Sequence, residues 1–565
     1  MATHRESRTS KPGGDHVYDA LVDAGIELLV GLPGTQTLPL DRVVAERSEM
    51  EYVMARHETS IPHIAWGYYE ASGKPAATLT VPGPGDTNAM HGLKNASEDC
   101  VPIIHISADI DPADRGKGPI HEIEADTYDN VVKANVNVET EAELSEKVGR
   151  AIEYALTPPY GPVRIGVPSS LLEATFEAST VSVTPETIHH DNETAYADAV
   201  DALTNAERPI IYVGGGARRS SGAGKPIENL AETLDAPVLS SYKGKGVFPE
   251  DDPRFLGVTA KHLPNSAKQV LDAADTVLAL GTDFDGITTA NWELPMGEML
   301  IHVNLDPTDI DAAYDSDIAI VDDATHASKR LLKGIRRTTD RSNAWNGAEL
   351  ASKARTEYVD NLEEQGLLAD SPVNTPGALR TIRDAIPRES IVTTDIGGFR
   401  LWSKQVFEAY NQQQYITAGS WAGMGVGLPA ALGAKLAHPD DPVVSLTGDG
   451  GLMMCLTELH TAAEHGLNVV VVVFNNCDYG VISKSPKIDQ YADGHRFEWG
   501  SPDFASIAEG FGCQGIDVDS RTSLRNALTD ALDAEKPTVI NVDIPSDEQS
   551  VVEASQYSSA IEPRQ

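Results

Sequence analysis

The sequence predicts an α/β protein built from three doubly wound parallel-sheet domains. Three stretches of the 565-residue chain each alternate short β-branched runs with helical patterns, which is typical of parallel strands joined by crossover helices. A chain of this length is too long for one hydrophobic core. Its composition, with 41% hydrophobic residues, is that of a globular protein.

The three predicted domains follow one another along the chain, with polar stretches between them. The first, residues 13–175, contains "LLVGLPG", "VPIIHISAD" and "GPVRIGVPSS". The second, residues 190–345, contains "RPIIYVGGGA", "TVLALGTDFDG" and "MLIHVNLDP". The third, residues 365–546, contains "SIVTTDIGG", "PVVSLTGDGG", "NVVVVVFNN" and "PTVINVDIP". Residues 176–192 and 340–368 are poor in apolar periodicity, so we expect them to be linkers.

Charge is the strongest compositional signal. The chain carries 85 acidic and 44 basic residues, a formal net charge of −41, and such a surface would repel nucleic acids and anionic membranes. The acidic residues are dispersed along the chain instead of forming a tail, a pattern typical of proteins from halophilic, salt-accumulating organisms. We therefore expect neither a nucleic-acid partner nor a membrane partner.

The apolar runs, the N-terminal residues and the cysteines indicate the cellular compartment and the redox state of the thiols. The longest apolar run extends only from Val469 to Phe474, too short to span a membrane. The polar start "MATHRESRTSKPGG" lacks the apolar stretch of a signal peptide, so we expect a cytoplasmic protein. The four cysteines lie far apart without a CxxC pair, which favours buried free thiols over disulfides or a zinc site.

Two strand ends in the third domain carry the residues of a phosphate and metal site. Val443–Thr447 leads into the turn Gly448-Asp449-Gly450-Gly451, and Val469–Phe474 leads into Asn475-Asn476. Leu452, Leu456, Leu459 and Ala463 repeat at helical spacing, so a helix is expected just after the glycines. Ligands of open parallel sheets bind beyond the carboxyl ends of the strands. A helix start with bare glycines suits a phosphate, and carboxylate and amide oxygens suit Mg²⁺. The pattern predicts a diphosphate bridged by Mg²⁺, with Asp449 and Asn476 on the metal.

The GDG turn, followed about 27 residues later by Asn-Asn, resembles the thiamine-diphosphate motif of the superfamily of 2-oxo-acid decarboxylases and acetolactate synthases. The resemblance extends from about residue 15 to about residue 545 and includes "VGLPGTQTLPL", "MARHETSIPHIAWGYYEASGKP", "VPGPGDTNAMHGL" and "SWAGMGVGLPAALGAKLA". It implies thiamine diphosphate and Mg²⁺ as cofactors. It also implies metal binding by Asp449, Asn476 and the backbone carbonyl of Asp478.

The resemblance assigns roles to further residues. Glu58 would hydrogen-bond N1′ of the aminopyrimidine, so that the exocyclic nitrogen becomes the base that deprotonates the thiazolium C2; by itself Glu58 could equally be an acid at a helix N-terminus. Met424 would wedge the cofactor into a bent shape, although the residue alone could be a core methionine. The carbonyl of Ala422 would receive the aminopyrimidine. The remaining expected cofactor contacts are Gly397, Gly398, Gly448, Gly450 and Gly451 at the diphosphate and Pro33, Gly34 and Asn88 at the pyrimidine side, where "GPGDTN" could also be a simple turn and N-cap.

Three positions depart from the pattern of acetolactate synthases. Ile120-His121 stands in place of a Phe-Gln pair, and Gly398-Phe399 in place of the Gln-His that follows the glycine of the first cofactor turn. Lys484-Ser485 stands where a tryptophan helps to select the second substrate. His121 could act as an acid or base at neutral pH, or could be satisfied by backbone hydrogen bonds. Lys484 could meet a substrate anion or remain a solvated surface lysine.

The expected activity is that of a thiamine-diphosphate- and Mg²⁺-dependent, acetolactate-synthase-like carboligase acting on a small 2-oxo acid. The alternative is a 2-oxo-acid decarboxylase of benzoylformate or sulfopyruvate type, and a more remote one is a non-catalytic cofactor-binding subunit. In the family the glutamate and the metal motif meet across subunits, which implies a homodimer or tetramer. FAD is possible, but its absence is the stronger expectation. "YVGGGARRSSGA" has glycines suited to a dinucleotide, whereas "GVTAKHLPNS" and "GTDFDG" lack the motifs that usually accompany FAD in the family.

Overall fold

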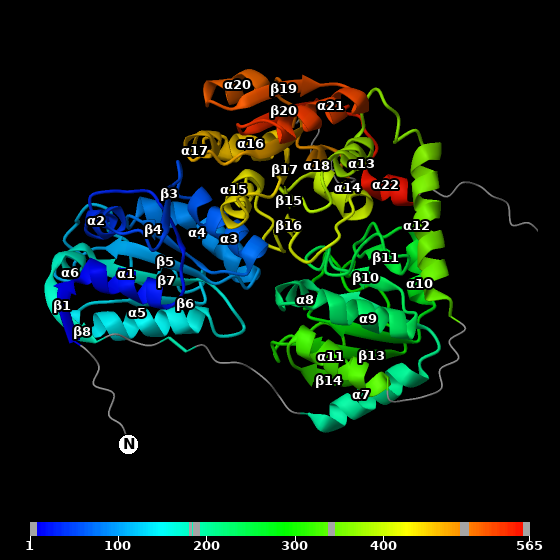
Figure 1. The fold of residues 1–565 in the computed structure, drawn as a ribbon, viewed down its shortest axis with the longest axis horizontal. Helices are drawn as coiled ribbons and strands as arrows, with labels where there is room; N and C mark the ends of the chain where they lie inside the picture. The colour runs from blue at the N-terminus through cyan, green and yellow to red at the C-terminus, as the bar shows by residue number, and fades with distance from the viewer. Residues whose placement is uncertain (1–7, 180–182, 185–191, 337–344, 486–496, 557–565) are drawn as a thin grey trace, which may run out of the picture.

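The computed structural model describes residues 8–179, 183–184, 192–336, 345–485 and 497–556. It contains three six-stranded parallel sheets and one two-stranded antiparallel sheet. Figure 1 shows the three sheet domains, with the N-terminal domain at the left, the central domain at the lower right and the C-terminal domain above it. The predicted fold class, three parallel α/β domains, is confirmed.

The N-terminal sheet has the strand order β3-β2-β4-β5-β7-β6. Its direction of winding reverses between β2 and β4, and such a switch point is where open α/β sheets bind ligands. Helices α1, α2, α5 and α6 cover one face of the sheet, and α3 and α4 cover the other. The elements are β1 (Arg8–Pro12), α1 (Gly13–Asp23), β2 (Leu28–Gly31), α2 (Leu38–Glu46), β3 (Glu51–Met54), α3 (Ser60–Ser72), β4 (Ala76–Thr80), α4 (Pro84–Glu98), β5 (Ile103–Asp109), β6 (Ala134–Asn137), α5 (Glu141–Ala155), β7 (Val163–Pro168), α6 (Ser169–Glu173) and β8 (Thr175–Ser179).

The central sheet has the order β11-β10-β9-β12-β13-β14, with its switch point between β9 and β12. Apolar clusters lie on both of its faces, as a buried parallel sheet requires. The elements are α7 (Glu193–Asn205), β9 (Pro209–Val213), α8 (Gly215–Arg219), α9 (Gly224–Leu234), β10 (Val238–Ser240), β11 (Phe255–Val258), α10 (Asn265–Asp272), β12 (Thr276–Leu280), β13 (Met299–Asn304), β14 (Ile318–Val321) and α11 (Ala324–Ile335).

The C-terminal sheet has the order β16-β15-β17-β18-β20-β19, with its switch point between β15 and β17. The elements are α12 (Gly347–Glu364), α13 (Thr375–Ala385), β15 (Ile391–Thr394), α14 (Gly398–Val406), β16 (Tyr415–Thr417), α15 (Gly427–Ala437), β17 (Val443–Gly448), α16 (Asp449–Cys455), α17 (Glu458–Glu464), β18 (Val469–Asn475), α18 (Gly480–Ser483), α20 (Phe504–Gly510), β19 (Gln514–Val518), α21 (Arg521–Leu532), β20 (Thr538–Asp543) and α22 (Val551–Gln556).

Both expected linkers contain regular structure. The first begins inside β8, which pairs with β1 in an antiparallel ladder; its residues 180–182 and 185–191 lie outside the described part of the chain. The second contains α12, an 18-residue helix that buries Ala351, Ala354, Tyr358 and Leu362. The expected helix after the glycines is also divided: α16 already begins at Asp449, and a separate helix, α17, begins at Glu458.

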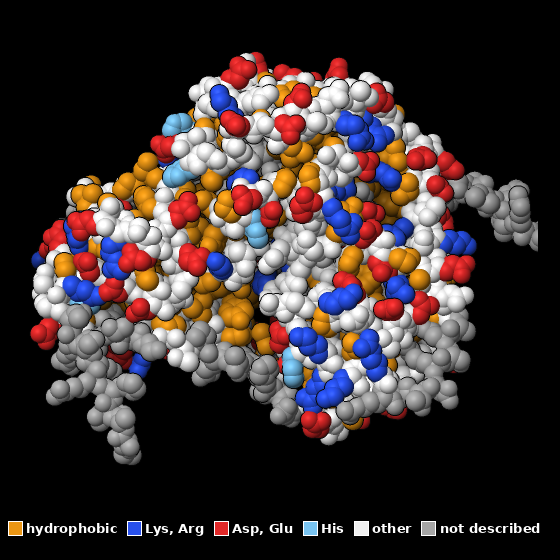
Figure 2. Space-filling model, in the orientation of Figure 1, with side chains coloured by type: hydrophobic (Ala, Val, Ile, Leu, Met, Phe, Trp, Pro, Cys, Tyr) orange, Lys and Arg blue, Asp and Glu red, His pale blue; other side chains and the backbone are white. Residues whose placement is uncertain are grey.

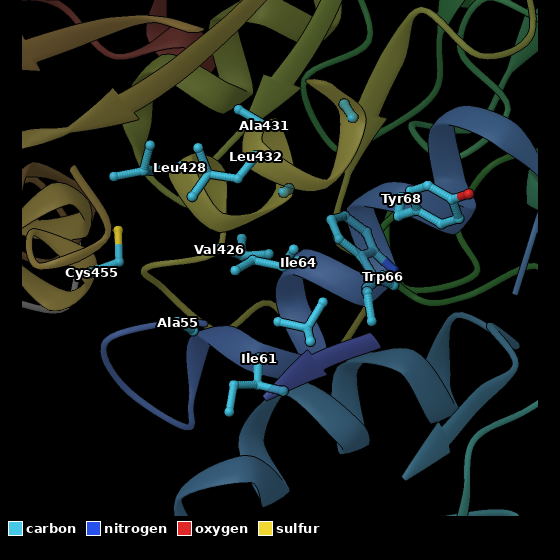
Figure 3. Packing of buried hydrophobic residues seen from close by; sticks show 14 of the residues in the cluster. Ala55, Ile61, Ile64, Trp66, Tyr68, Val426, Leu428, Ala431, Leu432 and Cys455 are labelled. Atoms are coloured by element: carbon cyan, nitrogen blue, oxygen red, sulfur yellow. The ribbon is translucent and has the colours of Figure 1, made fainter. Parts of the chain in front are cut away.

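The N-terminal and C-terminal domains share one apolar core. This core extends from the first sheet through α3 and α4 to α15, α16, α17 and the third sheet. Helices α3 and α15 lie so close that a Cβ at Gly67 would be 2.3 Å from the carbonyl oxygen of Ala430, and one at Gly433 would be 2.0 Å from that of Ile64. Figure 3 shows Ile64 of α3 beside Val426 at the start of α15. The two domains are therefore packed backbone against backbone.

The surface carries acidic and basic side chains interspersed with apolar ones (Figure 2). Orange side chains gather along the seam between the N-terminal lobe at the left and the rest of the molecule. No helix within the described ranges is long and apolar enough to cross a membrane.

Candidate active site

The predicted diphosphate glycines lie at the switch point of the C-terminal sheet. Gly397 caps α14 after β15, and Gly448 caps α16 after β17. Because β15 and β17 are hydrogen-bonded neighbours, the two turns open at the same edge. A Cβ built at Gly398 would meet nothing closer than Val481 Cγ2 at 4.0 Å, so the first turn of α14 faces free space. The N–H groups of this turn are accessible to an anion.

Asp449 is a buried carboxylate with one unused oxygen. Its Oδ1 accepts the N–H of Gly450 at 2.9 Å, but its Oδ2 has no hydrogen-bond partner among the described residues. Burial raises the pKa of Asp449 to about 6, an effect that the N–H groups of Gly450 and Cys477 reduce and the nearby Asp478 increases. A buried carboxylate oxygen without a donor is costly, so a cation at this position would stabilise it.

The loop after β18 brings the other two predicted metal residues to the same edge. The backbone N–H of Asp478 donates to Asn476 Oδ1 at 3.3 Å, and Cys477 between them has a φ of 54°. Asp478 Oδ2 accepts a hydrogen bond from Ser483 Oγ, whereas the buried Oδ1 is unpartnered. No group of three His, Cys, Asp or Glu side chains in the described residues forms a metal site. A metal here would therefore need amide and carbonyl oxygens besides Asp449.

The loop before α15 presents Ala422 and Met424 beside the glycine turn. A Cβ at Gly450 would lie 3.3 Å from Met424 Cε, so the thioether lies over the start of α16. Ala422 adopts a φ of 50°, which is uncommon for a residue with a side chain. Backbone strain of this kind clusters at functional sites.

Asp395, which the sequence analysis did not select, holds this loop in place. The side chain is fully buried at the end of β15, and it accepts the N–H groups of Gly425 at 2.9 Å and Gly427 at 3.2 Å and the hydroxyl of Thr447 at 3.2 Å. Burial raises its pKa, an effect that the N–H groups of Ile396, Gly427 and Gly425 oppose. Its position two residues before Gly397 in "TTDIGG" was the available signal.

The pyrimidine-side residues gather at the switch point of the N-terminal sheet. Asn88 Nδ2 donates to Glu58 Oε2 at 3.0 Å, and Thr59 Oγ1 donates to the carbonyl of Asn88 at 3.0 Å. Pro33 and Gly34 follow β2 and face the chain after β4, since a Cβ at Gly34 would lie 2.3 Å from Val81 Cγ1. The structure thus brings Glu58 and Asn88 into direct contact.

Glu458 of α17 fixes the backbone just before Glu58. Its buried carboxylate accepts the N–H groups of Arg56 and His57, each at 3.1 Å, and the hydroxyl of Thr461 at 2.7 Å. Sequence reasoning missed this contact because the partners are about 400 positions apart, as the separation of 401 between His57 and Glu458 shows. The C-terminal domain thereby supports the loop that carries the predicted catalytic acid.

The two predicted substrate residues lie in different surroundings. Gln36 Nε2 is 3.2 Å from His121 Nδ1, and the carbonyl of His121, at a φ of 67°, lies against Gly83 at the start of α4. His121 therefore belongs to the pyrimidine-side edge. Lys484 is exposed and donates to the carbonyl of Glu548 at 2.7 Å.

Helix α4 of the pyrimidine side contacts the loop before α15 in the same chain, since Trp421 Nε1 donates to His91 Nδ1 at 2.9 Å. Among the residues that the structure describes, no hydrogen bond or ion pair joins Glu58 or Asn88 to Asp449, Asn476 or Asp478. The metal side is surrounded by exposed apolar side chains. These are Trp421 (44% exposed), Met454 (56%), Tyr479 (38%), Val481 (50%) and Ile482 (52%). Large exposed apolar patches mark interaction surfaces.

A separate cavity of about 840 Å³ lies at the switch point of the central sheet. The glycines there pack on the protein itself: a Cβ at Gly214 would lie 2.1 Å from the carbonyl oxygen of Gly281. Two buried cations, Arg218 and Lys243, and the partly buried Arg219 lie beside it and pair with Glu70. Carboxylates line the same cavity, namely Asp283, Asp285, Asp306 and Asp309. Burial raises the pKa of Asp309 to about 6, with Asp306 and Asp283 adding to the effect.

Comparison with known proteins identifies the family. The chain matches three thiamine pyrophosphate enzyme families: the N-terminal TPP binding domain over residues 11–129, the central domain over residues 196–331, and the C-terminal TPP binding domain over residues 395–542. It is 30% identical to the acetolactate synthase large subunit of Parasynechococcus marenigrum, over 94% of this chain and 87% of that one. It is 28% identical to acetolactate synthase isozyme 1 large subunit of Escherichia coli (97% of each chain) and 28% identical to a probable acetolactate synthase large subunit of Methanococcus aeolicus (96% and 93%). The chain therefore belongs to the thiamine pyrophosphate enzyme family, as a thiamine-diphosphate-dependent enzyme that resembles acetolactate synthase.

Proposed function

We propose that this protein is a Mg²⁺-dependent carboligase of small 2-oxo acids, which decarboxylates pyruvate or a similar acid and adds the remaining group to a carbonyl acceptor. The observation that carries the proposal is the unpartnered Oδ2 of Asp449, buried beside the open glycine turns of the C-terminal sheet. When bound, thiamine diphosphate supplies a carbon nucleophile and an electron sink. The chain's own residues bind, orient and activate it.

The metal proposal assigns Mg²⁺ to Asp449, Asn476 and the carbonyl of Asp478. Hard oxygen donors of this kind suit Mg²⁺, which commonly bridges protein carboxylates and phosphates. The chemistry of this donor set and the partnerless carboxylate oxygen support the assignment. Gly398, Gly450 and Gly451 would offer backbone N–H groups to the diphosphate. The carbonyl of Ala422 would receive the aminopyrimidine, and Met424 would hold the cofactor in its bent shape.

Glu58 is proposed to hold and move the proton at the aminopyrimidine. Asn88 donates to one carboxylate oxygen, Oε2, which leaves Oε1 for the cofactor. The start of α4 lies against the same carboxylate, since a Cβ at Gly85 would be 3.7 Å from Glu58 Oε1. A positioned carboxyl group of this kind typically contributes 10²- to 10⁴-fold to rate.

The proposed active unit is a two-fold dimer in which Glu58 of each subunit faces the metal side of its partner. The support is that no hydrogen bond or ion pair among the described residues joins Glu58 to Asp449, and that apolar side chains such as Trp421 and Val481 are exposed around the metal side. An isologous interface covering this patch would complete two equivalent sites. A tetramer could be built from two such dimers.

The central cavity does not suit the diphosphate of FAD. Arg218, Arg219 and Lys243 are already paired with Glu70, and the aspartates that line the cavity would repel a dianion. We therefore propose that the enzyme works without flavin. Purified protein with flavin absorbance near one equivalent per chain would contradict this.

Product analysis with pyruvate as the sole substrate tests the proposed function. A carboligase yields acetolactate, whereas a simple decarboxylase yields acetaldehyde. Release of acetaldehyde without acetolactate would favour the decarboxylase alternative. Turnover of neither pyruvate nor any other 2-oxo acid in a panel, with cofactor and Mg²⁺ bound, would overturn the proposal.

A further inference from the structure

A saturated buried carboxylate lies beneath the first turn of α4. The Asp86 side chain has 0% exposure. Its Oδ1 accepts a hydrogen bond from Thr80 Oγ1 at 2.9 Å and lies 3.2 Å from His105 Nε2. Its Oδ2 accepts a hydrogen bond from Ser107 Oγ at 2.8 Å. Arg164 Nη2 also donates to Oδ2 at 3.2 Å. Four donors from the sheet therefore converge on one carboxylate of the helix.

These donors form a polar row across three neighbouring strands. Thr78 on β4 pairs in register with His105 on β5, and His105 pairs with Arg164 on β7. The remaining ring nitrogen, His105 Nδ1, is 2.9 Å from Thr78 Oγ1. Tyr128 additionally donates its hydroxyl to the carbonyl of Asp86. Both the side chain and the backbone of Asp86 are thus held by the N-terminal sheet domain.

The opposite side of the same helical turn holds Glu58. Two residues of an α-helix are separated by roughly 200° of rotation, so Asn88 projects away from the sheet when Asp86 points into it. Asn88 makes two bonds to the catalytic loop, one to Glu58 Oε2 and one from Thr59 Oγ1. One short helical segment therefore links the buried row to the Glu58 carboxylate.

We propose that Asp86 is a positioning residue for Glu58: by anchoring the first turn of α4 to the sheet, it fixes the Asn88 amide that orients the Glu58 carboxylate. This inference rests on the proposed role of Glu58. Fully satisfied buried polar networks make local structure rigid, and a displacement of about 1 Å at a reacting group can lower the rate about 10²-fold. Glu58 needs this rigidity because Asn88 is its only side-chain hydrogen-bond partner among the described residues.

The test is a double-mutant cycle of Asp86→Asn and Asn88→Ala, measured on the full chain with thiamine diphosphate and Mg²⁺ bound. Asp86→Asn is expected to lower kcat and the C2 proton-exchange rate about 10- to 100-fold, with KM and cofactor affinity within about twofold of wild type. Since Asp86 acts through Asn88, the double variant should be no slower than the slower single variant. In the cofactor-free protein, amide hydrogen exchange over residues 84–92 should be faster in Asp86→Asn, while exchange over α15 stays unchanged.

Effects of the two substitutions that multiply in the double variant, or a loss confined to KM, would overturn the inference. If Asp86→Asn does not fold, Ser107→Ala removes one donor to Asp86 and should show the same pattern with a smaller loss of about 3- to 10-fold, in proportion to one lost hydrogen bond. Glu58→Gln is measured in parallel. If Glu58→Gln is slow and Asp86→Asn is as fast as wild type, only this inference fails. If Glu58→Gln is itself as fast as wild type, the proposed role of Glu58 fails.

Discussion

Glu70 is the carboxylate on which a buried cluster of cations depends, and Glu70→Gln is the sharpest test of how the domains are held together. Its side chain is 1% exposed in the last turns of α3. It pairs with Arg218, lies 3.2 Å from Arg219 Nη2, and lies 3.6 Å from Lys243 Nζ. The second carboxylate nearby is Asp99, 2.9 Å from Lys243 Nζ. The cluster therefore balances three cations with two anions, across the N-terminal and central domains.

The amide of Glu70→Gln keeps the shape of the side chain and removes one of the two negative charges. Removing one partner of a buried ion pair typically destabilises a protein by about 3–5 kcal/mol. At roughly 2–4 °C per kcal/mol for domains of this size, the affected transition should fall by about 6–20 °C. The matched control is Glu98→Gln: Glu98 is 37% exposed and pairs with Lys94 four residues earlier, so its loss should change stability by less than about 0.5 kcal/mol.

The loss of stability caused by Glu70→Gln should also depend on pH. Burial lowers the pKa of Lys243 to about 7, with Arg219 and Arg218 lowering it and Asp99 raising it. The folded pKa lies below the unfolded one, so the unfolded state binds more protons above pH 7 and stability rises with pH there. Below pH 7 Lys243 is charged in the cluster and needs Glu70 most, so the deficit should be larger at pH 6 than at pH 8. Scanning calorimetry in molar salt measures this, and equal melting temperatures for Glu70→Gln and Glu98→Gln would refute the reasoning.

Three further predictions follow from the site and the charge. Glu58→Gln should lower turnover about 10²- to 10⁴-fold while the protein retains thiamine diphosphate, because the amide cannot exchange a proton. Asp449→Ala should instead abolish cofactor retention. Loss of the cofactor in Glu58→Gln together with its retention in Asp449→Ala would contradict both proposed roles. The −41 net charge should unfold the protein in dilute buffer and permit recovery in molar salt, since the Debye length falls from about 30 Å at 0.01 M to about 3 Å at 1 M; a melting temperature that stays flat over this range would contradict the prediction. The smallest active species should be a dimer, which light scattering combined with an activity assay can check, and an active monomer would disprove the shared site.

Sequence analysis placed Asp449 and Asn476 at the ends of two strands that the structure shows to be neighbours. The two residues are 27 positions apart, yet β17 and β18 pair directly, so motifs at their carboxyl ends must meet. Local glycine and carboxylate patterns therefore predicted this edge. Helix α12 within the second expected linker was not predicted, because two of its buried positions, Ala351 and Ala354, are small and give a weak apolar stripe.

The supporting acids were missed for a different reason. Asp395, Glu458 and Asp86 each bind groups from elements that only the tertiary fold brings together. For Asp86 the signal lies in the neighbouring strands: Thr78 and Thr80, like His105 and Ser107, alternate with apolar residues and so place polar side chains on one buried face. Such a stripe predicts a buried acceptor on the covering helix, although the pattern alone does not identify Asp86.

Helix α3 explains how the loop that carries Glu58 is held firmly in place. Every residue from Ser60 to Ala71 is buried, as expected for a helix enclosed on all sides. Its N-terminal approach is fixed by Glu458 of the C-terminal domain, and its last turns are fixed by the Glu70 cluster on the central domain. Its 13 residues span about 20 Å, so one rigid helix connects the loop of Glu58 to both other domains. The position of Glu58 is therefore a property of the whole chain, because contacts from both other domains fix the helix that follows it.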